Sequence, residues 1–86
     1  MAEYKTSGQV VLNEEQVLAL HRKMRDMCHD VNGRLANMAA AAELIRLRPT
    51  TVEERLPILL DQPHEAKKAL EVFSREFETA LGLSRA

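Results

Sequence analysis

The sequence predicts an all-α protein: an antiparallel helical hairpin with a kinked connector, which pairs into a dimeric four-helix bundle. Three observations lead to this fold class. Apolar residues recur every seven positions over much of the first half of the chain, as in helices that pack side by side. Residues 14–48 contain no proline, so nothing interrupts a long helix there. A chain of 86 residues buries only about 60–65% of its unfolded surface, so we expect self-association to supplement its core.

The first dozen residues are expected to form a flexible or short extended arm, because few of them are apolar. The first helix should begin after Asn13, whose side chain can cap it in a capping box with Gln16. Leu12 and Val17 occupy the positions of a hydrophobic staple across the same helix start. The predicted organisation is a flexible arm at residues 1–12, a hairpin domain at 13–82 and a C-terminal tail at 83–86.

The first helix is predicted over residues 14–48, with an apolar stripe along one side. Its two heptad rows are Val17, Met24, Val31, Met38 and Ile45, and Leu20, Met27 and Ala41. Cys28, Leu35 and Ala42 widen this stripe, which suits a bundle better than a two-stranded coiled coil. Pro49 should end the helix, because its ring cannot continue the hydrogen-bond ladder.

The second half of the hairpin contains two more prolines. Thr51 and Glu54 match a second capping box, but Pro57 predicts that residues 52–60 form only a short or kinked helical piece. We expect the last helix to begin at Pro63, with Gln62 or Asp61 as its cap, and to run to Leu81 before Gly82. This last helix would be shorter than the first.

Charge and composition exclude several classes of function. Twelve basic and thirteen acidic residues give a net charge of -1, without the basic excess that sequence-independent nucleic-acid binding requires. No apolar run approaches the roughly 20 residues of a membrane span, and we expect a cytoplasmic protein. Cys28, the single cysteine, cannot form an internal disulfide. No histidine or cysteine pair has the helical spacing of metal ligands, and neither a metal nor a cofactor is expected.

The adjacent pair His29 and Asp30 is the strongest candidate for chemistry. The heptad count places His29 on the side of the helix opposite the apolar rows, so we expect its imidazole to be exposed. An exposed imidazole beside a carboxylate can attack a phosphoryl donor. Arg25 lies one turn before His29 and can help to hold a phosphate. From the pair alone, an ordinary surface histidine remains the competing interpretation.

The stretch His29-Asp30-Val31-Asn32-Gly33-Arg34-Leu35, followed by Ala42-Glu43-Leu44-Ile45, resembles the H-box of sensor histidine kinases, which often reads His-Asp-x-Asn-Asn. The resemblance is to their dimerisation and histidine-phosphotransfer (DHp) domain. It implies a hairpin that pairs into a four-helix bundle, with His29 as phospho-acceptor, Asp30 as acid-base residue and Asn32 as the first motif asparagine.

Gly33 departs from the H-box, where phosphatase-active members usually carry a residue that orients a water. Gly33 and Asn37 instead resemble standalone histidine-phosphotransfer proteins, in which a small residue makes room for the partner. Those proteins imply a monomeric four-helix architecture as the alternative to the dimeric hairpin.

The resemblance implies a partner histidine kinase or a response regulator receiver domain as the binding partner. No ATP-binding domain fits in 86 residues, so we expect no autonomous kinase activity. The alternative function is a catalytically inactive dimeric scaffold or adaptor that binds another protein.

Overall fold

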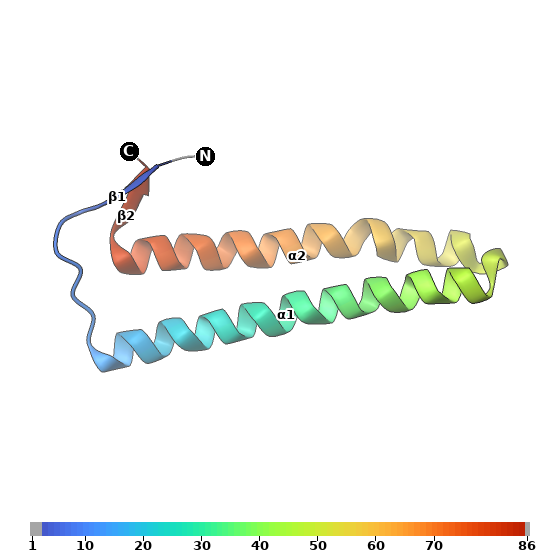
Figure 1. The fold of residues 1–86 in the computed structure, drawn as a ribbon, viewed down its shortest axis with the longest axis horizontal. Helices are drawn as coiled ribbons and strands as arrows, with labels where there is room; N and C mark the ends of the chain where they lie inside the picture. Colours follow the sequence, from blue (N-terminus) through green and yellow to red (C-terminus); the bar gives the residue numbers. More distant parts are fainter. Residues whose placement is uncertain (1–2, 86) are drawn as a thin grey trace.

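The computed structural model of the protein describes residues 3–85, and it is an antiparallel hairpin of two long helices (Figure 1). In chain order its elements are β1 (Tyr4–Thr6), α1 (Glu14–Leu47), the 3₁₀ turn η1 (Pro49–Thr51), α2 (Val52–Leu81) and β2 (Leu83–Arg85). The predicted all-α hairpin is confirmed. The two strands were not predicted.

Helix α1 begins as its local sequence predicts. The Asn13 side chain accepts a hydrogen bond from the Gln16 amide at 2.8 Å, and the Gln16 side chain accepts one from the Asn13 amide at 2.9 Å. This reciprocal capping box satisfies amides that have no partner within the helix. Glu14 and Glu15 follow in the first turn, where the helix dipole favours negative charge. The helix ends at Leu47, one residue before the predicted end, and Pro49 opens the connector.

Helix α2 corrects the prediction for the second half of the chain. Val52–Leu81 is one continuous helix of 30 residues, not a short piece followed by a new helix at Pro63. Pro57 and Pro63 lie inside it, although each removes one backbone hydrogen bond at a typical cost of about 3 kcal/mol. Residues on both sides of the prolines pack along α1, and such packing outweighs local propensity. The two helices are therefore nearly equal in length.

The residues predicted to cap helices in this region have other roles. Thr51 makes no side-chain cap with α2; its hydroxyl donates instead to the Arg48 carbonyl oxygen at 2.8 Å and so stabilises the turn. Gln62, expected as a cap, lies within α2 and faces α1. Gly82 does terminate α2 as predicted, in the left-handed conformation with φ of 64°.

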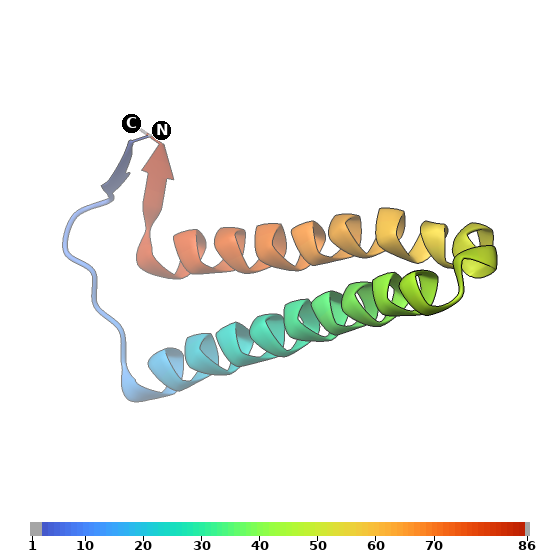
Figure 2. The same ribbon diagram turned by 45° about the vertical axis from the view of Figure 1, so that its right-hand side comes forward.

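The hairpin is thin and open. It measures 58 × 28 × 13 Å, and its shortest dimension is about the diameter of one helix with side chains. The helices lie close at the connector and diverge toward the end where α1 begins, in both views (Figures 1 and 2). Among residues 3–85, only Ala41 and Ala66 are buried. Their small side chains let the two helices lie close together, at Ala41 toward the connector and at Ala66 near the middle of α2, while the rest of the apolar stripe stays partly exposed.

A short β-ribbon joins the ends of the hairpin at its open side (Figure 2). β1 and β2 are antiparallel, with Tyr4 opposite Arg85 and Thr6 opposite Leu83. The Ser7 amide donates to the Gly82 carbonyl oxygen at 2.9 Å, which continues the pairing to the end of α2. The φ of 64° at Gly82 favours glycine; a Cβ atom there would also meet the Ser7 hydroxyl oxygen at 2.5 Å, but this exposed side chain can rotate away.

The two long flanks of the hairpin differ in chemistry. On one flank, Lys23 Nζ lies 3.7 Å from a Glu76 carboxylate oxygen, and the Asn37 amide donates to the Gln62 side-chain oxygen at 3.4 Å. We call the side of the hairpin with these contacts the charged flank. Successive residues are about 100° apart around a helix, and this spacing places a set of large apolar side chains on the opposite flank. All are exposed, and we call them the apolar face: Val17, Met24 and Leu35 of α1, with Leu56, Leu60, Leu70 and Phe77 of α2.

Candidate functional site

His29 lies in the middle of α1, and its side chain is exposed, as the heptad count predicts. Val31, two residues later, is half-buried against α2. Two residues correspond to about 200° around a helix, so His29 occupies the side of α1 that faces away from α2. A macromolecule can therefore reach its imidazole without any movement of the hairpin.

A shallow hollow of about 250 Å³ lies beside the imidazole. It is lined by His29, Asp30, Gly33, Arg34 and Asn37, which occupy about two successive turns of α1. An added Cβ at Gly33 would meet no atom within 4 Å, so the space above this glycine is open. The structure thus brings together four of the predicted site residues and adds Arg34 to them.

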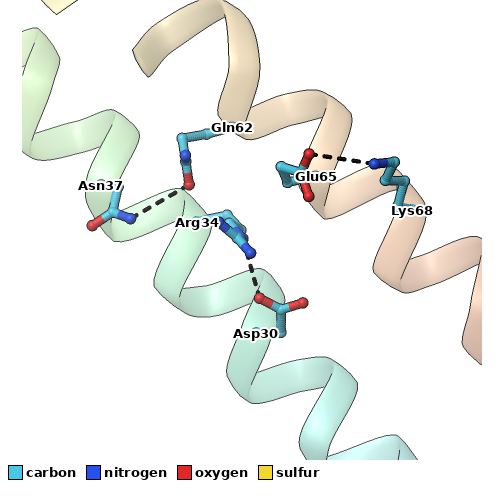
Figure 3. Close-up of polar contacts among 6 residues, drawn as sticks. All are labelled: Asp30, Arg34, Asn37, Gln62, Glu65 and Lys68. Carbon is cyan, nitrogen blue, oxygen red and sulfur yellow. Dashed lines mark hydrogen bonds and ion pairs between the residues drawn. The ribbon is translucent and has the colours of Figure 1, made fainter.

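The Asp30 carboxylate is bound to Arg34 rather than to His29. Arg34 Nε donates to Asp30 Oδ1 at 3.1 Å, in the helical i,i+4 pair that the sequence indicates (Figure 3). The pair draws the carboxylate along α1 toward the connector. The pair engages Oδ1 of the carboxylate, and no hydrogen bond joins Asp30 to His29 among the described residues.

Asn37 connects the hollow to the second helix. Its side-chain amide donates to Gln62 Oε1 across the hairpin (Figure 3). Gln62 is the residue that sequence reasoning missed, because it was expected at a helix start. Only the register between α1 and α2 reveals this contact, and that register depends on the continuous α2.

Arg25 and Asn32 are exposed residues of α1 that do not line the hollow. They are seven residues apart and so share one face, which is on the other side of His29 from Gly33. The structure therefore places His29 between two groups: Asp30, Gly33 and Asn37 on one side, Arg25 and Asn32 on the other.

The charges farther along α1 do not act on this site. Arg46 Nε donates to a Glu43 carboxylate oxygen at 3.0 Å, which lowers the pKa of Glu43 and raises that of Arg46. Glu43 is four helical turns from His29, or about 21 Å along the axis. Salt screens exposed charges over about 8 Å under physiological conditions, and the pair lies well beyond this distance from the hollow.

Within residues 3–85, no three histidine, cysteine or acidic side chains are placed to hold a metal ion. Neither of the two helices in this part of the chain is long and apolar enough to span a membrane. Comparisons with known proteins gave no match, either to a family model or to a curated protein or solved structure. The hairpin, its exposed histidine and its apolar face are therefore the features that indicate function.

Proposed function

We propose that the protein is a phosphotransfer module of the two-component signalling type, which accepts or relays a phosphoryl group on His29. The exposed position of His29 beside the open space at Gly33 carries this proposal. Transfer between two proteins needs a nucleophile that the second protein can approach, and this imidazole meets that need. The proposed partners are a histidine kinase as donor and a response regulator receiver domain as acceptor.

In the proposed reaction, an imidazole nitrogen of His29 attacks the phosphorus of the donor. A P–N bond forms while the donor oxygen leaves with the electron pair of the broken P–O bond. The second ring nitrogen then loses its proton, and Asp30 is the adjacent group that can take it up, through the carboxylate oxygen that Arg34 Nε does not bind. Arg25 is the cation proposed to bind the phosphoryl oxygens from the other side of the ring.

The remaining motif residues serve partner binding in this proposal. Gly33 leaves room for a partner side chain, because nothing occupies the position of its missing Cβ. Asn37 marks the far edge of the hollow and is held there by Gln62. Asn32 offers an exposed amide on the Arg25 side.

We further infer that two hairpins pair through their apolar faces into a dimeric four-helix bundle. The chain exposes 6905 Å², whereas a compact folded chain of 9.7 kDa exposes about 5,100 Å². Its radius of gyration of 18.1 Å also exceeds the roughly 12 Å of a compact domain of this length. The excess of roughly 1,800 Å² per chain, doubled in a dimer, falls in the size range of obligate interfaces.

The second candidate function is a catalytically inactive scaffold or adaptor that uses the same dimer to bind another protein. The Asp30–Arg34 pair favours this candidate, because it engages one oxygen of the carboxylate that would assist His29. The two functions share the hairpin and differ only in whether His29 is phosphorylated.

Phosphorylation assays with a matched control separate the two candidates. The chain is incubated with candidate histidine kinases and labelled ATP, as wild type, as His29→Gln and as His21→Gln, the last removing another exposed histidine of α1. The proposal expects acid-labile label on the wild type and on His21→Gln, and none on His29→Gln. Label that persists in His29→Gln, or no label with any kinase tested, would rule out phosphotransfer on His29 and leave the adaptor as the remaining candidate.

Asp30→Asn tests the second role in the same assay. If the carboxylate takes up the proton, the rate of labelling should fall by about 100-fold or more, with the mass and helix content of the protein unchanged. An unchanged rate would remove Asp30 from the reaction.

A further inference from the structure

An open groove lies between the two helices on the charged flank, and neither candidate function uses it. Its volume is about 400 Å³, and we call it the flank groove. Four of the residues that line it are apolar: Met27 of α1, with Ala69, Val72 and Phe73 of α2. Val72 is 47% exposed, and the other three are half-buried. The charged flank therefore also offers apolar surface to a partner.

The flank groove stays accessible when two hairpins pair through their apolar faces. Lys23 and Glu76, whose contact lies on the charged flank, both line the groove. The apolar face is on the opposite flank and shares no residue with the groove. The proposed dimer would thus carry two open grooves, and a single hairpin would carry one.

The shape of the flank groove suits a helix as its occupant. Along α2 the lining extends from Glu65 to Glu76, or about 16 Å, which is the length of three helical turns. A helix in such a groove presents apolar side chains at i, i+3 or i+4, and i+7. Small-molecule sites bury most of their ligand, whereas the exposure of Val72 shows that this groove is open.

The charge along the groove favours a basic occupant. Four carboxylates and two lysines line it, a net charge of -2: Asp26, Asp30, Glu65 and Glu76, with Lys23 and Lys68. Both lysines are already paired inside the groove. Lys23 lies 3.7 Å from Glu76, and Lys68 lies 3.5 Å from Glu65 (Figure 3). The uncompensated charge is therefore on the α1 side, at the two aspartates.

Asp26 is a carboxylate that the chain leaves unpaired. Among residues 3–85, its side chain takes part in no ion pair or hydrogen bond, not even with Arg22 one turn earlier. Asp30 follows one turn later, and Arg34 Nε binds only its Oδ1. Like charges one turn apart destabilise a helix, so a lysine or arginine of a partner would relieve this repulsion.

We propose that the flank groove binds a basic amphipathic helix of a partner protein, with its apolar row on the apolar lining and a cation beside Asp26 and Asp30. The same charge disfavours nucleic acid and anionic membranes, and it repels the flank groove of a second copy. Asp30 also lines the hollow at His29, so the bound helix would lie next to the imidazole. The inference goes beyond both candidate functions, because it requires neither phosphorylation nor the dimer.

Model peptides test the occupant on the full chain. The probe is a fluorescent peptide of about 15 residues, helical in design, with leucines along one face and lysines elsewhere. It should bind with a dissociation constant of micromolar order, and peptides with glutamate for lysine or alanine for leucine should bind at least about tenfold more weakly. Equal binding of either control peptide, or no binding of the probe up to about 1 mM, would overturn the proposal.

Asp26→Lys tests the charge without breaking an ion pair of the chain. It should weaken probe binding about tenfold, because it places a cation where the proposal places the cation of the peptide. Glu54→Lys changes the total charge equally, but Glu54 lies about 16 Å along α2 from Glu65, beyond the screening distance of about 8 Å. This control should change the binding less than about twofold. Equal losses would indicate attraction by the net charge alone and would overturn the assignment.

Val72→Lys tests the apolar lining, with Leu47→Lys as control because Leu47 is also exposed but lies next to the connector. The first variant should weaken probe binding about tenfold or more, and the second less than about twofold. Both positions are exposed, so the helix content should stay unchanged in each. Equal effects of the two variants would overturn the groove as the binding site.

Amide chemical shifts of the isotope-labelled protein locate the bound probe. The largest changes should occur at Met27, Ala69 and Phe73. Changes centred on Leu56 and Leu60 would place the probe on the apolar face and overturn the proposal. Light scattering should give the same number of chains with and without the probe; a fall from two chains to one would identify a second copy as the natural occupant and would also overturn it.

Discussion

Leu70→Asp and Val72→Asp are a matched pair that tests whether the apolar face is an interface. The two residues lie two positions apart on α2 and are equally exposed in the single chain, at 46% and 47%. Leu70 belongs to the apolar face, whereas Val72 borders the charged flank between the helices. In an isolated hairpin the two substitutions should therefore have similar effects on the free energy of unfolding.

In the dimer, the effects of the two substitutions on the free energy of dissociation should differ by several kcal/mol. Burying a whole leucine side chain contributes about 1.5–3 kcal/mol, so covering the 46% still exposed contributes about 1 kcal/mol per copy. Aspartate at this position also places a carboxylate in the interface, with a penalty of several kcal/mol per ion. We expect Leu70→Asp to cost the dimer at least about 4 kcal/mol, or roughly a 1,000-fold rise in dissociation constant. Val72→Asp, near exposed carboxylates, should cost less than about 1 kcal/mol.

Light scattering and thermal unfolding at several concentrations measure this difference. For a dimer that unfolds as it dissociates, tenfold dilution lowers the free energy of unfolding by about 1.4 kcal/mol. With an unfolding entropy of about 2.1 cal/mol/K per residue over two chains, the Tm should fall by about 4 °C. Wild type and Val72→Asp should show this dependence, and Leu70→Asp should be monomeric and largely unfolded. Equal effects of both substitutions, or a Tm independent of concentration, would refute the reasoning.

Four further substitutions test single features of the fold by urea unfolding. Asn13→Ala removes the capping box of α1 and should cost about 0.5–2 kcal/mol, whereas an unchanged midpoint would show that the cap contributes nothing. Gly82→Ala should cost about 1 kcal/mol because of the positive φ at this position. Gly33→Ala, in an open helical position, should instead stabilise the protein by about 0.5–1 kcal/mol, and the same sign for both would contradict this account. Met24→Asp, on the apolar face, should unfold the protein as it dissociates, so a folded monomer would count against the obligate dimer.

The course of α1 was predictable because its signals are local. Asn13 and Gln16 are three residues apart, and Pro49 ends the helix through its own ring. The exposure of His29 followed from the heptad rows, because helical geometry fixes which side of a helix each residue occupies. These inferences needed no knowledge of the rest of the chain.

The course of α2 was not predictable in the same way, because its local signals oppose its packing. Pro57 and Pro63 indicate breaks, yet the helix continues along α1 through both. The β-ribbon joins Tyr4–Thr6 to Leu83–Arg85, and three-residue strands so far apart in sequence carry no recognisable pattern. The Asn37–Gln62 contact at the candidate site depends on the same long-range register.

The β-ribbon also determines how the hairpin responds to mechanical force. A pull on Tyr4 and Arg85 in opposite directions first loads the pairing of β1 with β2, and an antiparallel ribbon loaded at its ends opens one residue pair at a time. Once the ribbon parts, the load reaches the diverging ends of α1 and α2, where little apolar surface is shared. The helices should then separate progressively toward the connector, so that Ala66, near the middle of α2, loses its contacts before Ala41 does.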